Sequence, residues 1–281
     1  MRIGFIGAGR VGCTMGKYLG LHGCSISGYS SRTRRSAEEA AEFTDTQVFD
    51  NRFELIDSCD IVMLTVSDRE IIPVWNEIKD YEGLTEKIVC HTSGAMSSEI
   101  FKDTPYQVYG YSVHPIYAVS DRFNVYRDFS NAFITIEGSP EKLDSLLRLF
   151  TDAGLKTGRI SSDKKVQYHA SCVMASNLVC GLYGAAVRLM SECGMTEEDA
   201  EVALKGLFRD NALGIVEKGA VKQLTGPLER GDAVTVRKHL DAFGDEEVKE
   251  MYTVLSRETM KLAAKKNPQI DYDKIFEEVL R

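Results

Sequence analysis

The chain has 281 residues, with 34 Lys and Arg against 42 Asp and Glu, which gives a formal net charge of -8. This length is enough for two domains that each bury a core. The acidic balance and the lack of a long basic run argue against a nucleic-acid partner, because phosphate backbones are bound by clustered Lys and Arg.

The first twelve residues combine an apolar strand with a glycine-rich turn. Residues 2–6 predict a buried parallel strand, and the turn that follows has the GxGxxG spacing of dinucleotide-binding proteins. The turn consists of Gly7, Ala8, Gly9, Arg10, Val11 and Gly12. Its glycines permit a tight turn, close approach to a pyrophosphate and packing of the next helix, predicted over 11–22, whose positive end faces the phosphates. We predict a dinucleotide site here; a purely structural turn is the alternative.

The residues after the second predicted strand, 24–29, indicate which dinucleotide is bound. NAD-specific proteins place an acid there for the ribose 2′-hydroxyl, whereas a 2′-phosphate favours arginine and hydroxyl donors. This chain has no acid and instead continues with Ser30, Ser31, Arg32, Thr33, Arg34 and Arg35. We predict NADP(H), bound by Ser30, Ser31 and Arg32. The alternative is that the arginines only solvate a helix start, which we expect for two of the three.

Strands and helices alternate up to residue 160. Further strands are predicted over 47–49, 60–66, 87–91, 108–113, 131–136 and 156–160, and helices over 36–43, 53–58, 71–79 and 141–153. The carboxyl ends of parallel strands are where open α/β sheets bind ligands. We therefore expect the cofactor to lie beside Thr65, Val66, Ser67, Thr92 and Ser93. For Ser93 the alternative is that it, or Ser97, caps the next helix.

From residue 161 the periodicity is helical. We predict helices over 161–192, 196–218, 233–243, 246–264 and 273–280. The predicted fold class is therefore α/β, with an N-terminal Rossmann-type doubly wound, mostly parallel sheet followed by an all-helical domain. The NADP-binding domain covers 1–160, and a helical domain for substrate binding and dimerisation covers 161–281.

Histidine is the first candidate for the proton donor that a nicotinamide enzyme needs, because its pKa lies near working pH. His114 ends a predicted strand at the ligand-binding edge. His169 and Asn177 are spaced to share one helix face with Val173. For either histidine the alternative is a buried, hydrogen-bonded side chain. We expect His91 to be buried in its strand.

Together these segments resemble a family of bacterial predicted oxidoreductases that pair a Rossmann-like domain with a helical C-terminal domain of uncharacterised type. The resemblance covers nearly the whole chain. It rests on GFIGAGRVG at 4–12, VSD at 66–68, HTSGA at 91–95, SVHP at 112–115, YHASCVMASN at 168–177 and LTGPLERGD at 224–232.

More distantly, the layout is similar to ketopantoate reductases, pyrroline-5-carboxylate reductases and prephenate dehydrogenases of the 6-phosphogluconate dehydrogenase superfamily. In ketopantoate reductases a Lys and an Asn on the first helix of the second domain handle the proton and the substrate. The resemblance puts His169 and Asn177 at those positions, so the Lys is replaced, although Lys164 and Lys165 lie nearby. Prephenate dehydrogenases use a His-Pro segment, which His114 matches.

The resemblance and the cofactor motif together predict an NADPH-dependent reductase of a small 2-oxo acid, with ketopantoate to pantoate, in pantothenate biosynthesis, as the leading example. His169 or His114 would donate the proton. The substrate would be bound by Asn177, Val173, Thr225 and Arg230, with Lys222 as an alternative to Arg230 and with Glu229 and Asp232 as candidate acids. Alternatives are another hydride transfer, such as an imine reductase or prephenate-dehydrogenase-like reaction, and a non-catalytic NADPH-sensing dimer.

The remaining expectations concern location and partners. The seven cysteines are scattered and lack metal-ligand spacing, so we expect reduced thiols and no metal site. We find no secretory leader and no stretch apolar enough to cross a bilayer, and therefore expect a cytoplasmic protein that does not bind membranes. Small residues over 170–186 suit close helix packing, which predicts a homodimer through the helical domain. The substrate is expected to be a small anion.

Overall fold

The computed structural model describes residues 1–277 and 279–280. The chain divides into two compact units, one of residues 1–176 and the other beginning at Asn177. The sequence places the boundary near residue 160. The difference arises because the helix that follows the last strand is anchored to the sheet by a buried lysine side chain, Lys165.

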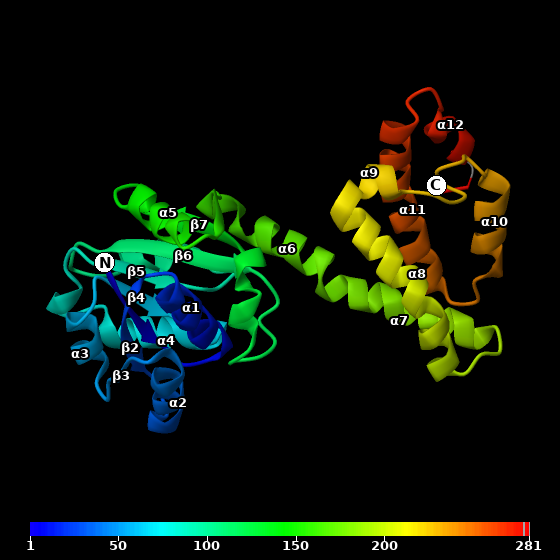
Figure 1. The fold of residues 1–281 in the computed structure, drawn as a ribbon. Helices are drawn as coiled ribbons and strands as arrows, with labels where there is room; N and C mark the ends of the chain where they lie inside the picture. Colours follow the sequence, from blue (N-terminus) through cyan, green and yellow to red (C-terminus); the bar gives the residue numbers. More distant parts are fainter. Residues whose placement is uncertain (278, 281) are drawn as a thin grey trace. The chain divides into compact units, whose positions relative to one another are not determined.

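The first unit is built on an eight-stranded sheet with the order β3-β2-β1-β4-β5-β6-β7-β8 (Figure 1). Its strands are β1 (Arg2–Ile6), β2 (Ser25–Ser30), β3 (Gln47–Val48), β4 (Ile61–Leu64), β5 (Ile88–His91), β6 (Tyr109–Ile116), β7 (Phe133–Gly138) and β8 (Lys156–Arg159). All neighbours are parallel except β6 and β7. The strand order reverses direction at β1 and β4, the switch point where doubly wound sheets bind ligands. The predicted fold class is confirmed.

Helices cover both faces of this sheet. They are α1 (Arg10–Leu21), α2 (Arg34–Thr44), α3 (Arg52–Asp57), α4 (Asp68–Ile78) and α5 (Leu143–Asp152), with short 3₁₀ turns at Glu82–Leu84, Ser98–Lys102, Val125–Arg127, Phe129–Asn131 and Ser162–Lys164. The unit ends with α6 (Lys165–Ala175), of which only Lys165 is buried. Successive strand residues point to opposite faces, so two cores form. Phe5 and Met63 pack under α1, α2 and α5, whereas Val62 and Trp75 belong to the core with α3 and α4.

β6 is longer than the sequence predicts, and this changes the place of His114. Its parallel pairing with β5 ends at the pair His91 and Ser112, but β6 continues to Ile116 because β7 pairs with it in the antiparallel direction. His114 lies opposite Thr135 in that extension. His114 is therefore inside a strand, beyond the parallel edge, and not at a strand end as predicted.

The second unit is helical, as predicted. It consists of α7 (Asn177–Glu192), α8 (Glu197–Lys218), α9 (Ala220–Gln223), α10 (Ala233–Ala242), α11 (Glu246–Lys266) and α12 (Tyr272–Phe276). Its core is formed mainly by Val236, Leu240, Met260 and Phe276. The helix predicted over 273–280 is shorter, and that range includes residue 278, which lies outside the described residues. The short helix α9 was not predicted.

The single helix predicted over 161–192 is interrupted at Ser176, whose φ of -129° and ψ of -81° are not helical. His169 therefore lies on α6 in the first unit, and Asn177 begins α7 in the second. The prediction that His169 and Asn177 share one helix face assumed a continuous helix, and the break at Ser176 removes that basis.

The stretch Ser162–Glu192 is also apolar enough, by length and composition, to cross a membrane, which corrects our expectation that no stretch is. The reason is that no charged residue occurs between Lys165 and Arg188. A single stretch of this kind is weak evidence for a membrane span.

Candidate active site

The glycine-rich turn after β1 has the close contacts that only glycine permits. Gly7 has a φ of 113°, and a Cβ on it would lie 2.7 Å from the carbonyl carbon of Thr65. Its N–H donates to the Ser30 carbonyl at 2.8 Å, and its carbonyl accepts from Thr65 Oγ1 at 2.7 Å. The N-cap of α1 is Gly9, which provides no capping side chain. The first N–H groups of α1 are thus available to an anion.

A cavity of about 480 Å³ opens at this turn. The predicted cofactor residues that line it are Gly7, Ala8, Gly9, Ser31, Arg32, Thr65, Val66 and Ser67, and they are joined by Ile6, Thr33, Ser36, Arg52, Arg69, Glu70, Val74 and Glu77. The other predicted cofactor residues, Arg10, Val11, Gly12, Ser30, Thr92 and Ser93, do not line it. Ser30 is buried and acts through its carbonyl, which fixes Gly7.

Two of the three arginines after β2 are engaged in surface ion pairs. Arg34 is paired with Glu38 and Asp50, and Arg35 is paired with Glu39. Among the described residues Arg32 forms no ion pair, and it is exposed at the rim of the cavity. A free guanidinium beside hydroxyl groups, with no acid at the end of β2, fits a ribose 2′-phosphate. The residues present therefore fit NADP(H).

The side chain of Lys165 lies close to the turn after β5 and is a buried ammonium group. It is 1% exposed, and its Nζ donates to Ser112 Oγ of β6 at 2.5 Å. Ser112 Oγ in turn donates to the carbonyl of Ser93 at 3.2 Å. Burial lowers the pKa of Lys165 to about 8, although the carboxylates of Glu137 and Asp68 oppose this shift.

A hydrogen-bonded chain places His114 beside this lysine. His114 Nδ1 lies 2.7 Å from Tyr168 Oη, which lies 2.7 Å from Thr135 Oγ1. Burial and, to a smaller extent, the nearby charge of Lys165 lower the pKa of His114 to about 4, so the imidazole is neutral at pH 7. Burial raises the pKa of Tyr168 to about 12.

Both predicted catalytic histidines meet at Gly94. A Cβ on Gly94 would lie 2.5 Å from His169 Cδ2 and 2.9 Å from His114 Nε2. The rings of the two histidines are 6.3 Å apart between centroids. The structure thus brings His114, His169 and Lys165 to one place, at the edge where β5 and β6 end their parallel pairing.

The serines of the turn after β5 have structural roles. Ser93 Oγ donates to Asp68 Oδ2 at 2.7 Å and accepts from the N–H groups of Ala95 and Met96. Ser97 Oγ accepts from the N–H of Glu99. His91 is fully buried, as expected, and burial lowers its pKa to about 4. The capping alternative thus describes Ser97, the N-cap of the 3₁₀ turn Ser98–Lys102, whereas Ser93 stabilises the turn before it. A nicotinamide contact of Thr92 and Ser93 stays a prediction.

The two candidate acids of the second unit, Asp232 and Glu229, interact with residues of that same unit. Asp232 caps α10 by accepting from the N–H of Thr235 at 3.0 Å. Glu229 lies 3.4 Å from the ammonium of Lys266 and also accepts from Asn267. A cavity of about 520 Å³ between α7 and α8 includes Thr225 in its lining. Arg230 and Lys222 are exposed.

The substrate roles of Asn177, Val173, Thr225 and Arg230 stay predictions. Among residues 1–277 and 279–280 there is no group of three or more His, Cys, Asp or Glu side chains that could hold a metal ion.

Lys165 is a site residue that its position beside Lys164 in the sequence does not by itself indicate. A signal was present. Positions 165, 168, 169 and 172 follow the i, i+3, i+4, i+7 spacing of one helix face, and that face also contains Tyr168 and His169. Lys164 is exposed, whereas Lys165 is buried.

The fold and the nucleotide cavity are those of a dinucleotide-binding protein, and the family match over residues 2–93 indicates an NADP-dependent oxidoreductase. In the comparison with family models, residues 2–93 match the family described as "NADP oxidoreductase coenzyme F420-dependent", and residues 132–259 match a domain of unknown function, DUF2520. The NADP(H) prediction is confirmed by the first match. No curated protein sequence matches the chain significantly.

Solved structures share the fold over nearly the whole chain. Protein TM1727 from Thermotoga maritima is 24% identical, with a TM-score of 0.73, and the match covers 94% of this chain and 99% of that one. A pyrroline-5-carboxylate reductase from Coxiella burnetii is 15% identical, with a TM-score of 0.60 and coverage of 97% for both chains. A reductive aminase from Aspergillus terreus is 12% identical, with a TM-score of 0.61 and coverage of 98% for both. The resemblance to ketopantoate reductases is not supported by these comparisons.

Proposed function

We propose that the protein is an NADPH-dependent reductase of carbon–nitrogen double bonds, acting on a cyclic imine that bears a carboxylate. This replaces the 2-oxo acid of the leading sequence prediction with its imine alternative. The observation that carries the proposal is the buried ammonium group of Lys165 beside the neutral His114. The similar folds of proteins named pyrroline-5-carboxylate reductase and reductive aminase support the choice of an imine.

Reduction of an imine needs a hydride at carbon and a proton at nitrogen. Bound NADPH supplies the hydride. Lys165 supplies the proton, because its lowered pKa of about 8 lies near working pH, where a general acid is most effective. Ser112 Oγ holds the Nζ atom in place from β6. After transfer the proton is on the product nitrogen, and Lys165 is left as a neutral amine that burial favours.

His114 orients the substrate. Its Nδ1 is engaged with Tyr168, and its Nε2 faces the space at Gly94, which the lack of a side chain leaves to the rings of His114 and His169. A neutral imidazole can hydrogen-bond a substrate atom without adding a second positive charge beside Lys165. His169 lines the same space.

Substrate selection tests this proposal directly. Purified protein is assayed for NADPH oxidation with 1-pyrroline-5-carboxylate, other cyclic imines, ketopantoate and further 2-oxo acids. We expect the best imine to exceed the best 2-oxo acid in kcat/KM by at least about tenfold, equivalent to about 1.4 kcal/mol of transition-state binding. Faster turnover of ketopantoate than of every imine would overturn the proposal.

The pH profile identifies the acid. Lys165 must be protonated to donate, so kcat should be flat below pH 7 and fall about tenfold per unit above its pKa of about 8. Glu137→Gln keeps a hydrogen-bond acceptor for Ser98 but removes a carboxylate that raises this pKa, so the fall should move to lower pH. A profile that already falls near pH 4 would assign the proton to His114 instead.

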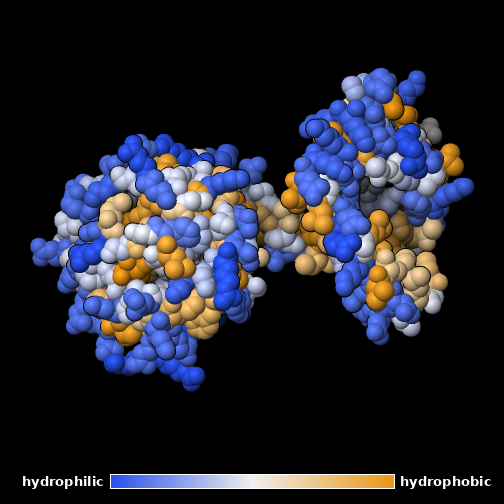
Figure 2. Space-filling view, in the orientation of Figure 1, coloured by the Kyte–Doolittle hydropathy of each residue, from blue (hydrophilic) through white to orange (hydrophobic). Residues whose placement is uncertain are grey.

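We also propose that the chain forms a homodimer through α7 and α8. These helices expose large apolar side chains, among them Leu178, Val202, Leu207 and Val216, which are 58%, 70%, 71% and 83% exposed. Figure 2 shows apolar residues at the surface of the second unit. Several exposed apolar side chains on neighbouring helices are typical of an interaction surface. Acidic and basic residues are distributed along α8, which disfavours a bilayer and favours a second copy.

Light scattering tests the dimer. The wild-type chain should have the mass of a dimer at micromolar concentration, and Leu207→Asp should shift it to a monomer because a charge would be buried without a partner. Leu21→Asp, at a similarly exposed position on α1, is the matched control and should remain dimeric. A monomeric wild-type chain would contradict the proposal.

A further inference from the structure

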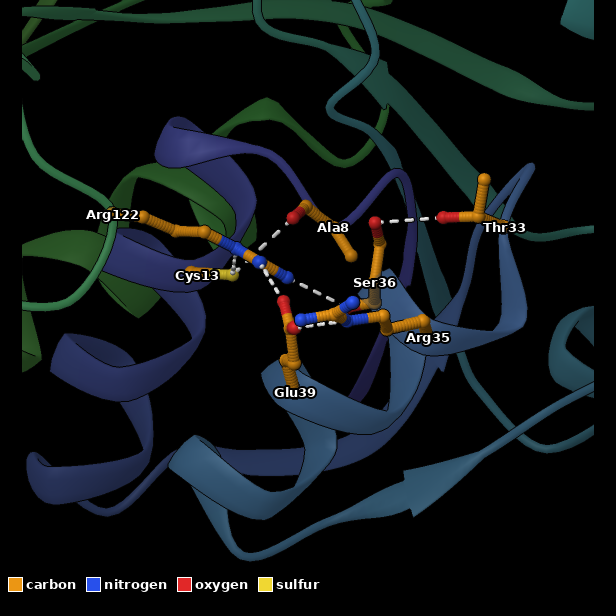
Figure 3. A network of polar contacts seen from close by, with 7 residues as sticks. All are labelled: Ala8, Cys13, Thr33, Arg35, Ser36, Glu39 and Arg122. Carbon is orange, nitrogen blue, oxygen red and sulfur yellow. Dashed lines mark hydrogen bonds and ion pairs between the residues drawn. The ribbon is translucent and has the colours of Figure 1, made fainter.

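The long connection between β6 and β7 contains Arg122, whose side chain contacts helices α1 and α2 beside the nucleotide cavity. The guanidinium group of Arg122 makes three hydrogen bonds (Figure 3). Its Nε donates to Cys13 Sγ of α1 at 3.2 Å. Its Nη1 donates to Glu39 Oε2, and its Nη2 donates to the Ser36 carbonyl, both on α2 and both at 2.6 Å. Arg122 therefore joins α1 to the first turns of α2.

The connection holds Arg122 in this position from both sides. Asp121 Oδ1 accepts from the N–H groups of Phe123 and Asn124, at 2.8 and 2.7 Å, which fixes a turn around Arg122. The Phe123 ring packs edge-on against Phe43 of α2, with centroids 5.0 Å apart. The side chain of Arg122 is only 20% exposed. Its position is thus set by the structure around it and loses little rotamer freedom in contacting α2.

Two of the three contacts, those with Cys13 and Ser36, connect Arg122 to two parts of the nucleotide cavity. Cys13 Sγ lies 3.5 Å from the carbonyl of Ala8, in the glycine-rich turn. Ser36 lines the cavity near Arg32, and its Oγ accepts from Thr33 Oγ1 at 2.7 Å. Arg122 therefore links the glycine-rich turn, which would hold the pyrophosphate, to the hydroxyl groups of Thr33 and Ser36, which would hold the 2′-phosphate.

Arg122 also acts through charge. Glu39 lies in α2 close to Ser36 in sequence, and its carboxylate would repel a phosphate. Hydrogen bonds from Arg35 and Arg122 hold the pKa of Glu39 below its usual range, so it is ionised and its charge is compensated by two guanidinium groups. If Arg122 is removed, Glu39 loses one compensating charge close to Ser36, which lines the cavity and whose carbonyl Arg122 also contacts.

We propose that Arg122 is a positioning residue that makes the protein select NADP(H) over NAD(H). It holds the first turn of α2 against the glycine-rich turn and compensates the charge of Glu39. The inference rests on the cofactor and not on the proposed imine substrate, so its test needs no turnover.

The test is equilibrium binding, by calorimetry, of NADP⁺, NAD⁺, 2′,5′-ADP and 5′-AMP to the full chain. In Arg122→Met we expect the dissociation constants of NADP⁺ and 2′,5′-ADP to rise about tenfold, and those of NAD⁺ and 5′-AMP less than about twofold, because only the first pair carries the 2′-phosphate. The control is Arg127→Met, an exposed arginine of the same connection, which should bind all four ligands like the wild type.

Two further variants keep the proposal falsifiable. Adding Glu39→Gln to Arg122→Met should recover part of the NADP⁺ affinity, because the uncompensated carboxylate is removed. Arg122→Lys retains the charge and serves if the methionine variant does not fold; it should lose about threefold in the ratio of NADP⁺ to NAD⁺ affinity, since it lacks the planar fork that contacts both helices. An equal loss for NADP⁺ and NAD⁺, or an unchanged ratio in both variants, would overturn the proposal.

Discussion

Lys165→Met is expected to lower kcat with the preferred imine by about 10²- to 10⁴-fold, the range that a general acid contributes. Methionine has a similar length and is apolar, so it removes the proton donor from Ser112 while filling the same buried space. A buried ammonium group costs free energy, and the thermal midpoint of the variant should therefore equal or exceed that of the wild type. Steady-state kinetics and a melting curve on the same preparation provide both values.

The matched control for this prediction is Lys164→Met. Lys164 precedes Lys165 but is exposed, so its loss should change kcat by less than about twofold. NADPH binding should be close to wild type in both variants, because neither lysine lines the nucleotide cavity. Near-normal turnover of a folded Lys165→Met protein would contradict the assignment and would transfer the role to His114 or His169, which lie against the same glycine.

Gly7→Ala is expected to weaken NADPH binding by about 100-fold or more. The new Cβ would lie 2.7 Å from the backbone of Thr65, at a φ of 113° that side chains rarely adopt. Left-handed strain costs about 1–3 kcal/mol and overpacking a similar amount, and about 2.7 kcal/mol already corresponds to 100-fold. Because the turn moves to relieve the clash, the N–H groups of α1 no longer face the pyrophosphate.

The control for Gly7 is on the helix that follows it. A Cβ on Gly20, near the end of α1, would meet only Ile26 Cγ1 at 3.7 Å, an ordinary contact. Gly20→Ala should therefore bind NADPH like the wild type, with a small gain in helix stability. Fluorescence titration of NADPH measures both variants. Wild-type affinity in Gly7→Ala would show that the cofactor does not approach this turn.

The nucleotide site was predictable because its parts are close in sequence. β1, the glycine-rich turn and α1 follow one another, so residue type and order suffice to place Gly7 and Gly9. The ion pairs of Arg34 and Arg35 were also open to prediction, since each arginine precedes a glutamate by one helical turn. Arg32 as the 2′-phosphate ligand stays a prediction.

The proton-donor site was only partly predictable because it joins distant segments. The hydrogen bond between His114 and Tyr168 and the one from Lys165 to Ser112 link residues 54 and 53 positions apart. These links require the antiparallel pairing of β6 with β7, which periodicity does not reveal. The break at Ser176 carries neither glycine nor proline, the usual signals, and so the sequence suggested one continuous helix.

The central claim is hydride transfer to the carbon of a C=N bond, and isotope transfer tests it most directly. NADPH that carries deuterium at both C4 positions is incubated with the protein and the best imine, and the amine product is analysed by mass spectrometry. We predict one deuterium, located on the former imine carbon. If NADPH binds tightly but no product from any imine or 2-oxo acid contains deuterium, the catalytic account is contradicted and the chain is an NADPH-binding protein without this activity.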